Sequence, residues 1–224
     1  MKKSTYIIAE LSANHGHKLE NALASVRAAK AAGADAIKIQ TYTADTITLD
    51  CDSADFQVKS GTLWDGTTLY QLYKQAYTPW EWHQAIFDEA KKIGIDCFST
   101  PFDKTAVDFL EQLGNPIYKI ASFEITDIPL IEYAASKHKP MIISTGIATP
   151  EDIQLALEAC HRVGNFDVTL LHCVSAYPAP LENVNLRTMM DMADRYGVKV
   201  GLSDHTMGSD VAIAAVSLGA TVIE

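Results

Sequence analysis

Short apolar runs alternate with helical segments along this 224-residue chain, and this alternation constrains the fold more than any other feature. Runs rich in β-branched or aromatic residues predict strands at 5–9, 35–41, 95–99, 117–121, 141–144, 168–172, 198–202 and 221–223. Helical patterns predict full-length helices at 19–32, 79–92, 104–113, 128–136, 150–163, 184–196 and 208–218. Crossovers of this length suit parallel strand pairing.

Eight strand–helix units in one chain predict an α/β fold, the (β/α)8 TIM barrel. A doubly wound open sheet is the alternative, but it needs a glycine-rich phosphate loop after the first strand, where the chain reads LSANHGH. No helix follows the last strand. We therefore expect one barrel domain, residues 1–224, that is incomplete at its C-terminus and ends within the eighth strand.

A long segment without regular pattern, residues 42–67, follows the second predicted strand. Insertions of this length usually form a lid or a wall of a site. Two later Thr-Pro pairs, Thr78-Pro79 and Thr149-Pro150, predict helix starts with threonine as N-cap and proline in the first position.

The formal charge of −10 argues against a nucleic-acid partner, because no basic stripe exists to neutralise phosphates. No apolar run has the length of a membrane span and no signal peptide is visible, so a cytoplasmic protein without a membrane partner is expected. The four cysteines lack metal-ligand spacing and are expected to be reduced and buried.

Polar residues stand at the ends of seven consecutive predicted strands, where a barrel carries its function. Two of them, Lys38 and Lys119, lie within strands, and a buried lysine is costly unless an anion meets it. A structural Lys–Glu pair is the alternative for either lysine taken alone. Two such lysines in an acidic chain indicate one anion site built from several strand ends.

The strand-end residues sort by chemistry. The groups suited to a phosphate are Lys38, Lys119, Thr100, Ser122 and Ser144. Glu10 and Glu124 are candidates for acid–base chemistry or for holding substrate hydroxyls. His205 follows a strand beside an acidic residue and is the best candidate metal ligand, whereas His172 lies inside a strand and is expected to be a core or hydrogen-bonding residue.

Seven segments resemble the sialic acid synthase family, in the family's order: IIAELSANHG, DAIKIQTY, FSTPFD, YKIASFEITD, MIISTGIAT, LLHCVSAYPAP and GLSDHT. Members condense phosphoenolpyruvate with an amino-sugar aldose to a nine-carbon 2-keto acid and release phosphate. ELSANH and LYQLYKQAYTPWEWH resemble the pseudaminic acid synthase branch, since other branches more often show E-I-G-x-N-H in the first motif. Sialic acid synthases also commonly have asparagine at the position of Ser175.

The resemblance implies roles for particular residues. Phosphoenolpyruvate would be bound by Lys38, Thr100, Lys119, Ser122 and Ser144, the sugar by Glu10, Gln40 and Tyr177, and proton transfer would fall to Glu10 and Glu124. His205 would be one of two histidine ligands to Mn²⁺ or Mg²⁺. The second family histidine lies in an E-K-H-F motif, of which Glu224 is the first residue. Family members also carry an antifreeze-like domain that reaches across a homodimer.

Three alternatives remain open. The first is a sialic or legionaminic acid synthase, which differs only in the sugar. The second is a 3-deoxy-octulosonate phosphate synthase, which needs a further phosphate site that no extra Lys/Arg cluster supports. The third is a non-catalytic barrel fragment that keeps the anion site. We expect a 2,4-diacetamido-2,4,6-trideoxy hexose as the sugar, with Ser175 as local support, and expect Trp80 and Trp82 to pack a helix against the barrel.

Overall fold

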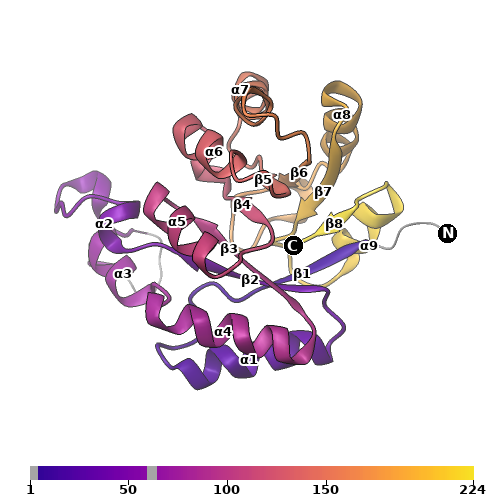
Figure 1. Cartoon of the computed structure of the whole chain (residues 1–224). Helices are drawn as coiled ribbons and strands as arrows, with labels where there is room; N and C mark the ends of the chain where they lie inside the picture. The colour runs from indigo at the N-terminus through magenta and orange to yellow at the C-terminus, as the bar shows by residue number, and fades with distance from the viewer. Residues whose placement is uncertain (1–4, 60–64) are drawn as a thin grey trace.

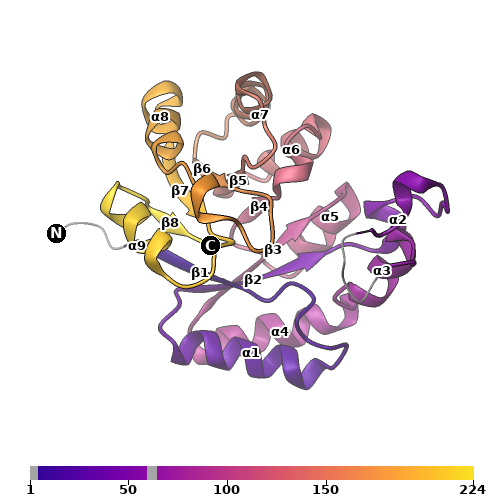
Figure 2. The ribbon, with the colours of Figure 1, turned by 180° about the vertical axis from the view of Figure 1, so that it is seen from behind.

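A closed ring of parallel strands occupies the centre of the molecule, and helices surround it (Figures 1 and 2). This computed structural model describes residues 5–59 and 65–224. The strands are β1 (Tyr6–Glu10), β2 (Ala36–Thr41), β3 (Asp96–Pro101), β4 (Tyr118–Ile120), β5 (Met141–Ser144), β6 (Val168–Cys173), β7 (Lys199–Ser203) and β8 (Val222–Ile223). The helices are α1 (Leu19–Ala31), α2 (Ala44–Ile47), α3 (Leu69–Ala76), α4 (Trp80–Ile93), α5 (Lys104–Gln112), α6 (Ile128–Ala135), α7 (Pro150–Arg162), α8 (Arg187–Tyr196) and α9 (Asp210–Ser217), with 3₁₀ turns at Ala54–Phe56, Ser122–Glu124 and Leu181–Asn183.

The ring closes through β8, which is only two residues long. Ile223 of β8 pairs with Leu202 of β7 on one side and with Ile7 of β1 on the other. The strand order around the ring is the sequence order, so the predicted (β/α)8 barrel is confirmed and an open sheet is excluded. The assignment of residues 1–224 to one domain stays a prediction.

Apolar side chains fill the barrel interior on one side of the polar strand ends. Residues two apart on a strand share a face, and the inward positions of the strands meet in one cluster. This cluster, which we call the floor, consists of Ile8, Ala36, Phe98, Ile142, Leu171 and Val222. A larger apolar cluster lies between the outward faces of the strands and the helices. The floor lies directly beneath the next inward side chain of each strand.

The two Thr-Pro pairs differ in outcome. Thr149 accepts a hydrogen bond from the backbone N–H of Asp152 and forms a capping box with it, so the predicted start of α7 is confirmed. Thr78 does not cap α4, because its hydroxyl contacts Nε2 of the buried His15 at 3.3 Å. The prediction for Thr78 is wrong because a distant side chain competes for the hydroxyl.

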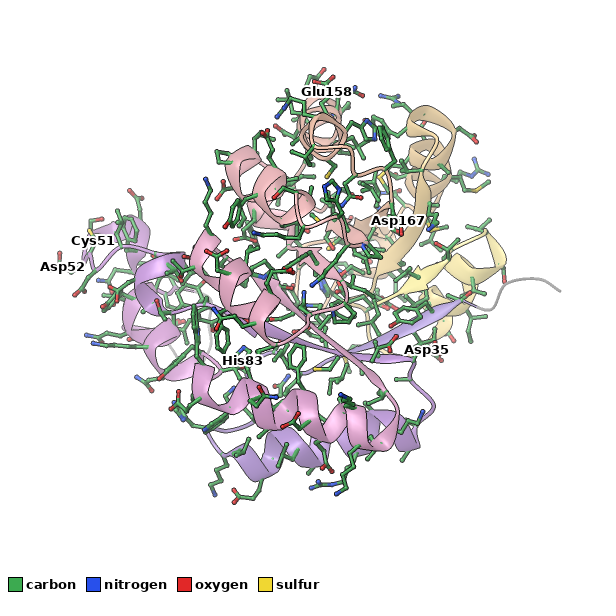
Figure 3. All side chains as sticks on the ribbon, viewed as in Figure 1. Asp35, Cys51, Asp52, His83, Glu158 and Asp167 are labelled. Carbon is green, nitrogen blue, oxygen red and sulfur yellow. The ribbon has the colours of Figure 1, made fainter. Side chains whose placement is uncertain are left out.

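The segment after β2 contains α2 and one 3₁₀ turn, and residues 60–64 of it lie outside the described residues. Its tip, with Cys51 and Asp52, lies at the periphery of the molecule (Figure 3). Its base is tied to the barrel by Tyr42, whose ring contacts those of Tyr73 and Phe102 at 5.6 and 5.3 Å. The segment therefore borders the carboxyl ends of β2 and β3, as expected for a wall.

All four cysteines are free, and three are buried, whereas Cys51 is partly exposed, contrary to expectation. Among the helices of the described residues, none has both the length and the apolar character that crossing a membrane requires.

Gly201 of β7 lies directly against Val222 of β8. A Cβ added there would clash with the Val222 carbonyl oxygen and would come within 2.8 Å of Leu171 Cδ2. We expect Gly201→Ala to lower the free energy of unfolding by about 2 kcal/mol or more, the range for overpacking a core. Urea unfolding monitored by circular dichroism measures this. Gly94→Ala is the matched control, since Gly94 has a positive φ but open space around it. A smaller loss for Gly201→Ala than for Gly94→Ala would contradict the prediction.

Candidate active site

Polar side chains form a layer directly above the floor. Each strand carries an inward polar or sulfur-bearing residue two positions after an inward apolar residue or glycine, the spacing that keeps both on one face. The members of this polar layer are Glu10, Lys38, Thr100, Lys119, Ser144, Cys173, Ser203 and Glu224. The layer lies at the carboxyl ends of the strands, where barrel enzymes hold their catalytic groups.

Two lysines and two glutamates form a buried network in this layer. Lys38 pairs with Glu10, and its Nζ lies 3.6 Å from Glu224 Oε1. Lys119 Nζ lies 3.4 Å from Glu224 Oε2, and Ser203 Oγ donates to that oxygen at 2.8 Å. The side chains of both lysines and Glu224 are at most 7% exposed. The structural Lys–Glu pair is thus present, and it links the two predicted anion-binding lysines through one carboxylate.

The network sets the charge of its members. Burial opposes the charge of Lys38, but Glu10 and Glu224 more than offset it and raise the pKa of Lys38. Burial lowers the pKa of Lys119, the nearby charge of Lys38 acts in the same direction, and Glu224 only partly offsets both. Burial opposes the charge of Glu224, yet Lys119 and Lys38 bring its pKa below the ordinary value. We assign Lys38 and Glu224 as charged.

Hydroxyl groups border the lysines. Lys38 Nζ donates to Thr100 Oγ1 at 3.3 Å, and Ser122 Oγ accepts from the backbone N–H of Gly146 at 3.1 Å. Ser144 Oγ is buried and has no hydrogen-bond partner among the described residues. A buried hydroxyl without a partner is costly, so a ligand that bonds to Ser144 would satisfy it. The structure places Lys38, Thr100, Lys119 and Ser144 in the polar layer and Ser122 in the turn after β4, and their role in anion binding stays a prediction.

Glu124 ends the 3₁₀ turn after β4 and has an unusual ionisation. Burial raises its pKa to about 7, although the charge of Lys119 acts in the opposite direction. Its Oε2 atom is buried without a hydrogen-bond partner in the part of the chain that the structure describes. A carboxyl group that titrates near neutrality both donates and accepts protons at working pH, as acid–base chemistry requires.

His205 follows β7 with one ring nitrogen engaged. Its Nδ1 lies 2.8 Å from the carbonyl oxygen of Val174, which only accepts, so Nδ1 carries the proton and Nε2 keeps the lone pair that a metal needs. Burial lowers its pKa, but the Cys173 sulfur and the Val174 carbonyl raise it overall. Asp204 instead accepts from the N–H and hydroxyl of Thr206.

His205 fits a metal as a single ligand. Within residues 5–59 and 65–224, no group of three or more His, Cys, Asp or Glu side chains is arranged to hold a metal ion. His172 has the role that its strand position predicts, since its buried Nε2 donates to the Val184 carbonyl at 2.6 Å.

The residues implied to contact a sugar lie towards the mouth of the barrel. Glu10 has a side chain that is 26% exposed, and Gln40 follows Lys38 on the inward face of β2. Tyr177 is 77% exposed, and its ring lies 4.1 Å from that of His205. Gly146 lets Ser175 approach its backbone closely, because an added Cβ would clash with Ser175 Oγ.

Sequence patterns did not identify three members of the polar layer as site residues: Cys173, Ser203 and Glu224. The signal was available, since each follows an inward residue by two positions at the end of a strand. Local sequence does not reveal the role of Glu224, because its lysine partners lie far from it in the chain and meet it only when the barrel closes.

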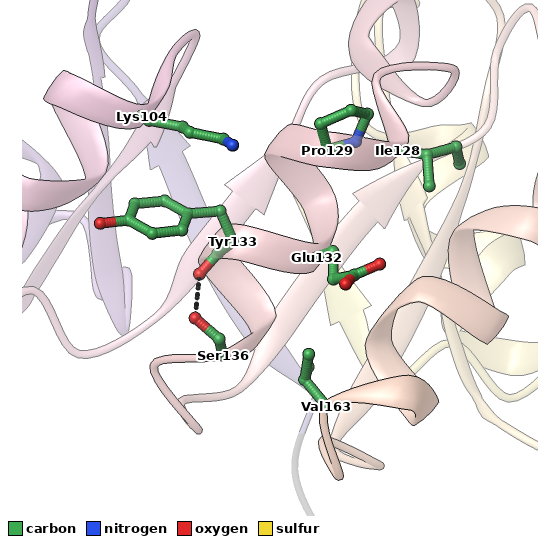
Figure 4. A pocket seen from close by; sticks show the side chains of 7 residues that line it. All are labelled: Lys104, Ile128, Pro129, Glu132, Tyr133, Ser136 and Val163. Atoms are coloured by element: carbon green, nitrogen blue, oxygen red, sulfur yellow. Dashed lines mark hydrogen bonds between the residues drawn. The ribbon is translucent and has the colours of Figure 1, made fainter.

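A separate hollow runs along α6 on the outside of the barrel (Figure 4). Its polar groups are already paired, because Glu132 binds Arg162 at 2.8 Å and Ser136 Oγ donates to the Tyr133 carbonyl at 2.7 Å. Among the residues that the structure describes, the buried side-chain polar atoms without a hydrogen-bond partner belong to Glu10, Glu124, Ser144 and Glu224 and none to this hollow, so we place the candidate site at the strand ends.

Known proteins resemble this chain in sequence and in fold. The chain is 51% identical over 218 residues to pseudaminic acid synthase of Helicobacter pylori, covering 97% of this chain and 64% of that protein. It is 39% identical over 225 residues to N,N'-diacetyllegionaminic acid synthase of Legionella pneumophila, covering 98% and 62%. The crystal structure of an N-acetylneuraminic acid synthetase from Leptospira borgpetersenii, in complex with citrate, matches with a TM-score of 0.85 and 32% identity, covering 98% of this chain and 72% of that one.

The chain thus spans about 64% of the length of the pseudaminic acid synthase that it matches. Residues 25–224, most of the chain, match the model of the NeuB family. The resemblance to sialic acid synthases is confirmed, and the chain belongs to the NeuB family.

Proposed function

We propose that this chain carries the active site of a pseudaminic acid synthase. In this reaction phosphoenolpyruvate, water and 2,4-diacetamido-2,4,6-trideoxy-L-altrose give the nine-carbon 2-keto acid and phosphate. The observation that carries the proposal is the pair of buried lysines, Lys38 and Lys119, beside the orphaned Ser144 hydroxyl at the strand ends. The name of the relative with 51% identity supports the choice of sugar.

Phosphoenolpyruvate, an anion, fits this site because the two lysine side chains are buried there. Phosphoenolpyruvate brings a phosphate and a carboxylate, and charge-assisted hydrogen bonds to lysine are stronger than neutral ones. Lys38 and Lys119 are bridged by Glu224, so a bound anion must share the lysines with this carboxylate. Ser122, Ser144 and Thr100 supply the neutral donors around them.

The chain's own residues support a stepwise condensation. The methylene carbon of phosphoenolpyruvate forms a C–C bond to the aldehyde carbon, the C=O π bond breaks and the aldehyde oxygen takes up a proton to become a hydroxyl, and positive charge develops at the carbon that bears the phosphate. Water adds there, and the C–O bond to phosphate breaks as the tetrahedral intermediate collapses. Glu124, with a pKa of about 7, accepts and returns the proton near this carbon, and Glu10 orients the sugar from the mouth.

His205 would hold a divalent metal ion, Mn²⁺ or Mg²⁺, through Nε2, since Nδ1 is fixed by the Val174 carbonyl. A metal ion bound there would supply a Lewis acid to the aldehyde oxygen of the sugar. Because the described residues offer no complete ligand set, we derive no step through the metal.

We also propose a homodimer in the cytoplasm that uses small-molecule substrates and neither nucleic acid nor membrane. The net charge of −10 supports the absence of a nucleic-acid partner, the four free cysteines support the cytoplasm, and the homodimer rests on the family resemblance alone.

The function is tested by phosphate release from phosphoenolpyruvate with three sugars: the 2,4-diacetamido sugar of the proposal, its legionaminic acid counterpart and N-acetylmannosamine. We expect kcat/KM to be highest with the first, in MnCl₂, and to fall with EDTA. A methyl group in an apolar pocket discriminates by about ten- to two-hundred-fold, and an unmatched hydroxyl by more. Equal or better kcat/KM with N-acetylmannosamine would refute the choice of sugar. If none of the three sugars leads to phosphate release, a non-catalytic barrel is favoured.

The two lysines are tested separately. Lys38→Met and Lys119→Met should each weaken phosphoenolpyruvate binding by about 2–3 kcal/mol, because each removes charge-assisted hydrogen bonds. Isothermal titration calorimetry measures the affinity. Lys139→Met is the matched control, since Lys139 pairs with Glu111 outside the barrel.

Loss of one lysine also leaves Glu224 less well compensated and destabilises the fold. Adding Glu224→Gln to Lys119→Met should restore part of the stability without restoring affinity. Unchanged affinity in both single lysine variants would rule out the anion site.

Glu124 should make the stability of the protein depend on pH. Its folded pKa of about 7 lies above the ordinary 4.5, so the folded state increasingly disfavours the charged form as pH rises between these values. The free energy of unfolding of the parent should therefore fall from pH 4.5 to pH 7. In Glu124→Gln this part of the fall should be absent. Urea unfolding at several pH values measures this, with exposed Glu158→Gln as control. The same pH dependence in the parent and Glu124→Gln would contradict the assignment.

A further inference from the structure

The carboxylate of Glu10 is held at both of its oxygens. Glu10 ends β1 opposite Lys38 in the strand register, and Oε2 faces the Lys38 ammonium group. Oε1 accepts two hydrogen bonds from Ser12, one from the backbone N–H at 2.9 Å and one from Oγ at 2.8 Å. The side chain therefore lies between a buried cation on one side and the loop after β1 on the other.

Ser12 holds this place in an unfavourable backbone conformation. Its φ is 48°, in the left-handed region that costs energy for a residue with a Cβ and none for glycine. The other non-glycine residues with positive φ in residues 5–59 and 65–224 are His17, His138 and Asn185, whose types are enriched there. Serine lacks that preference, and what it adds over glycine is the hydroxyl that donates to Glu10.

We infer that Ser12 is a positioning residue for Glu10. Its hydroxyl holds the carboxylate in the orientation that keeps Oε2 on Lys38 and presents the exposed edge of Glu10 to the barrel mouth. The Glu10 side chain is 26% exposed and that of Lys38 only 6%, so a ligand entering from the mouth reaches Glu10 first. This inference rests on the proposed function, in which Glu10 contacts the aldose.

Two substitutions separate the hydroxyl from the backbone. Ser12→Ala and Ser12→Gly both remove the hydroxyl, but only Ser12→Gly relieves the positive φ. We expect kcat/KM for the aldose to fall about ten-fold or more in both, as for a lost hydrogen bond to a charged group. The dissociation constant of phosphoenolpyruvate should stay within about three-fold, because Lys38, Lys119 and the hydroxyls remain. The urea midpoint of Ser12→Gly should equal or exceed that of the parent.

The matched control is His138→Gly, which makes the same backbone change at an exposed residue outside the site and should leave kcat/KM unchanged. Parent-like kcat/KM in Ser12→Gly overturns the inference. A loss in Ser12→Ala alone also overturns it, because backbone strain then explains the loss.

A second measurement does not depend on turnover. Crystal structures of the parent and Ser12→Gly should show Glu10 in one orientation in the parent and in several in the variant. A single unchanged orientation in Ser12→Gly refutes the positioning role. An inactive parent that shows this structural difference would contradict the proposed function and leave the role of Ser12 supported.

Discussion

A carboxylate held between two lysines from different strands is the interaction on which the barrel interior depends. Moving such charges out of water costs several kcal/mol per ion unless the partners meet with good geometry. Glu224 meets Lys38 and Lys119 only when β8 closes the ring, with β2 and β4 in their observed register. A slip of one residue in β2 would turn Lys38 outward and bring Ile39 inside. Charge compensation and apolar burial therefore demand the same strand register.

Inside the barrel, the residues that stabilise the fold lie deeper than the polar residues of the candidate site. One inward residue on most strands is apolar and belongs to the floor, and the residue two positions later is polar. Ile142 and Ser144 on β5, or Leu171 and Cys173 on β6, show this step. Substitutions in the floor act on packing, whereas substitutions in the polar layer act on bound ligands and on the charge network. The division follows from the two-residue period of a strand.

The sequence predicts what depends on local pattern. Alternating strands and helices, the cap at Thr149 and the core role of His172 follow from neighbouring residues, and the structure confirms them. Contacts between distant residues decided the rest. Thr78 fails as a cap because His15 takes its hydroxyl, and Glu224 gains its partners only through ring closure. Such contacts require the three-dimensional fold, which no window of sequence contains.

The floor also determines from which side a ligand can reach the polar layer. Ile8, Phe98, Leu171 and the other floor residues are buried beneath the lysines, so a ligand would reach the polar layer from the carboxyl ends of the strands. A molecule bound to Lys38 and Lys119, as proposed above, would lie against the floor, and a second molecule that contacts the exposed Tyr177 would lie nearer the mouth. In that arrangement the ligand on the lysines would bind before the outer one. The depth of the anion site would therefore set the order in which two ligands bind.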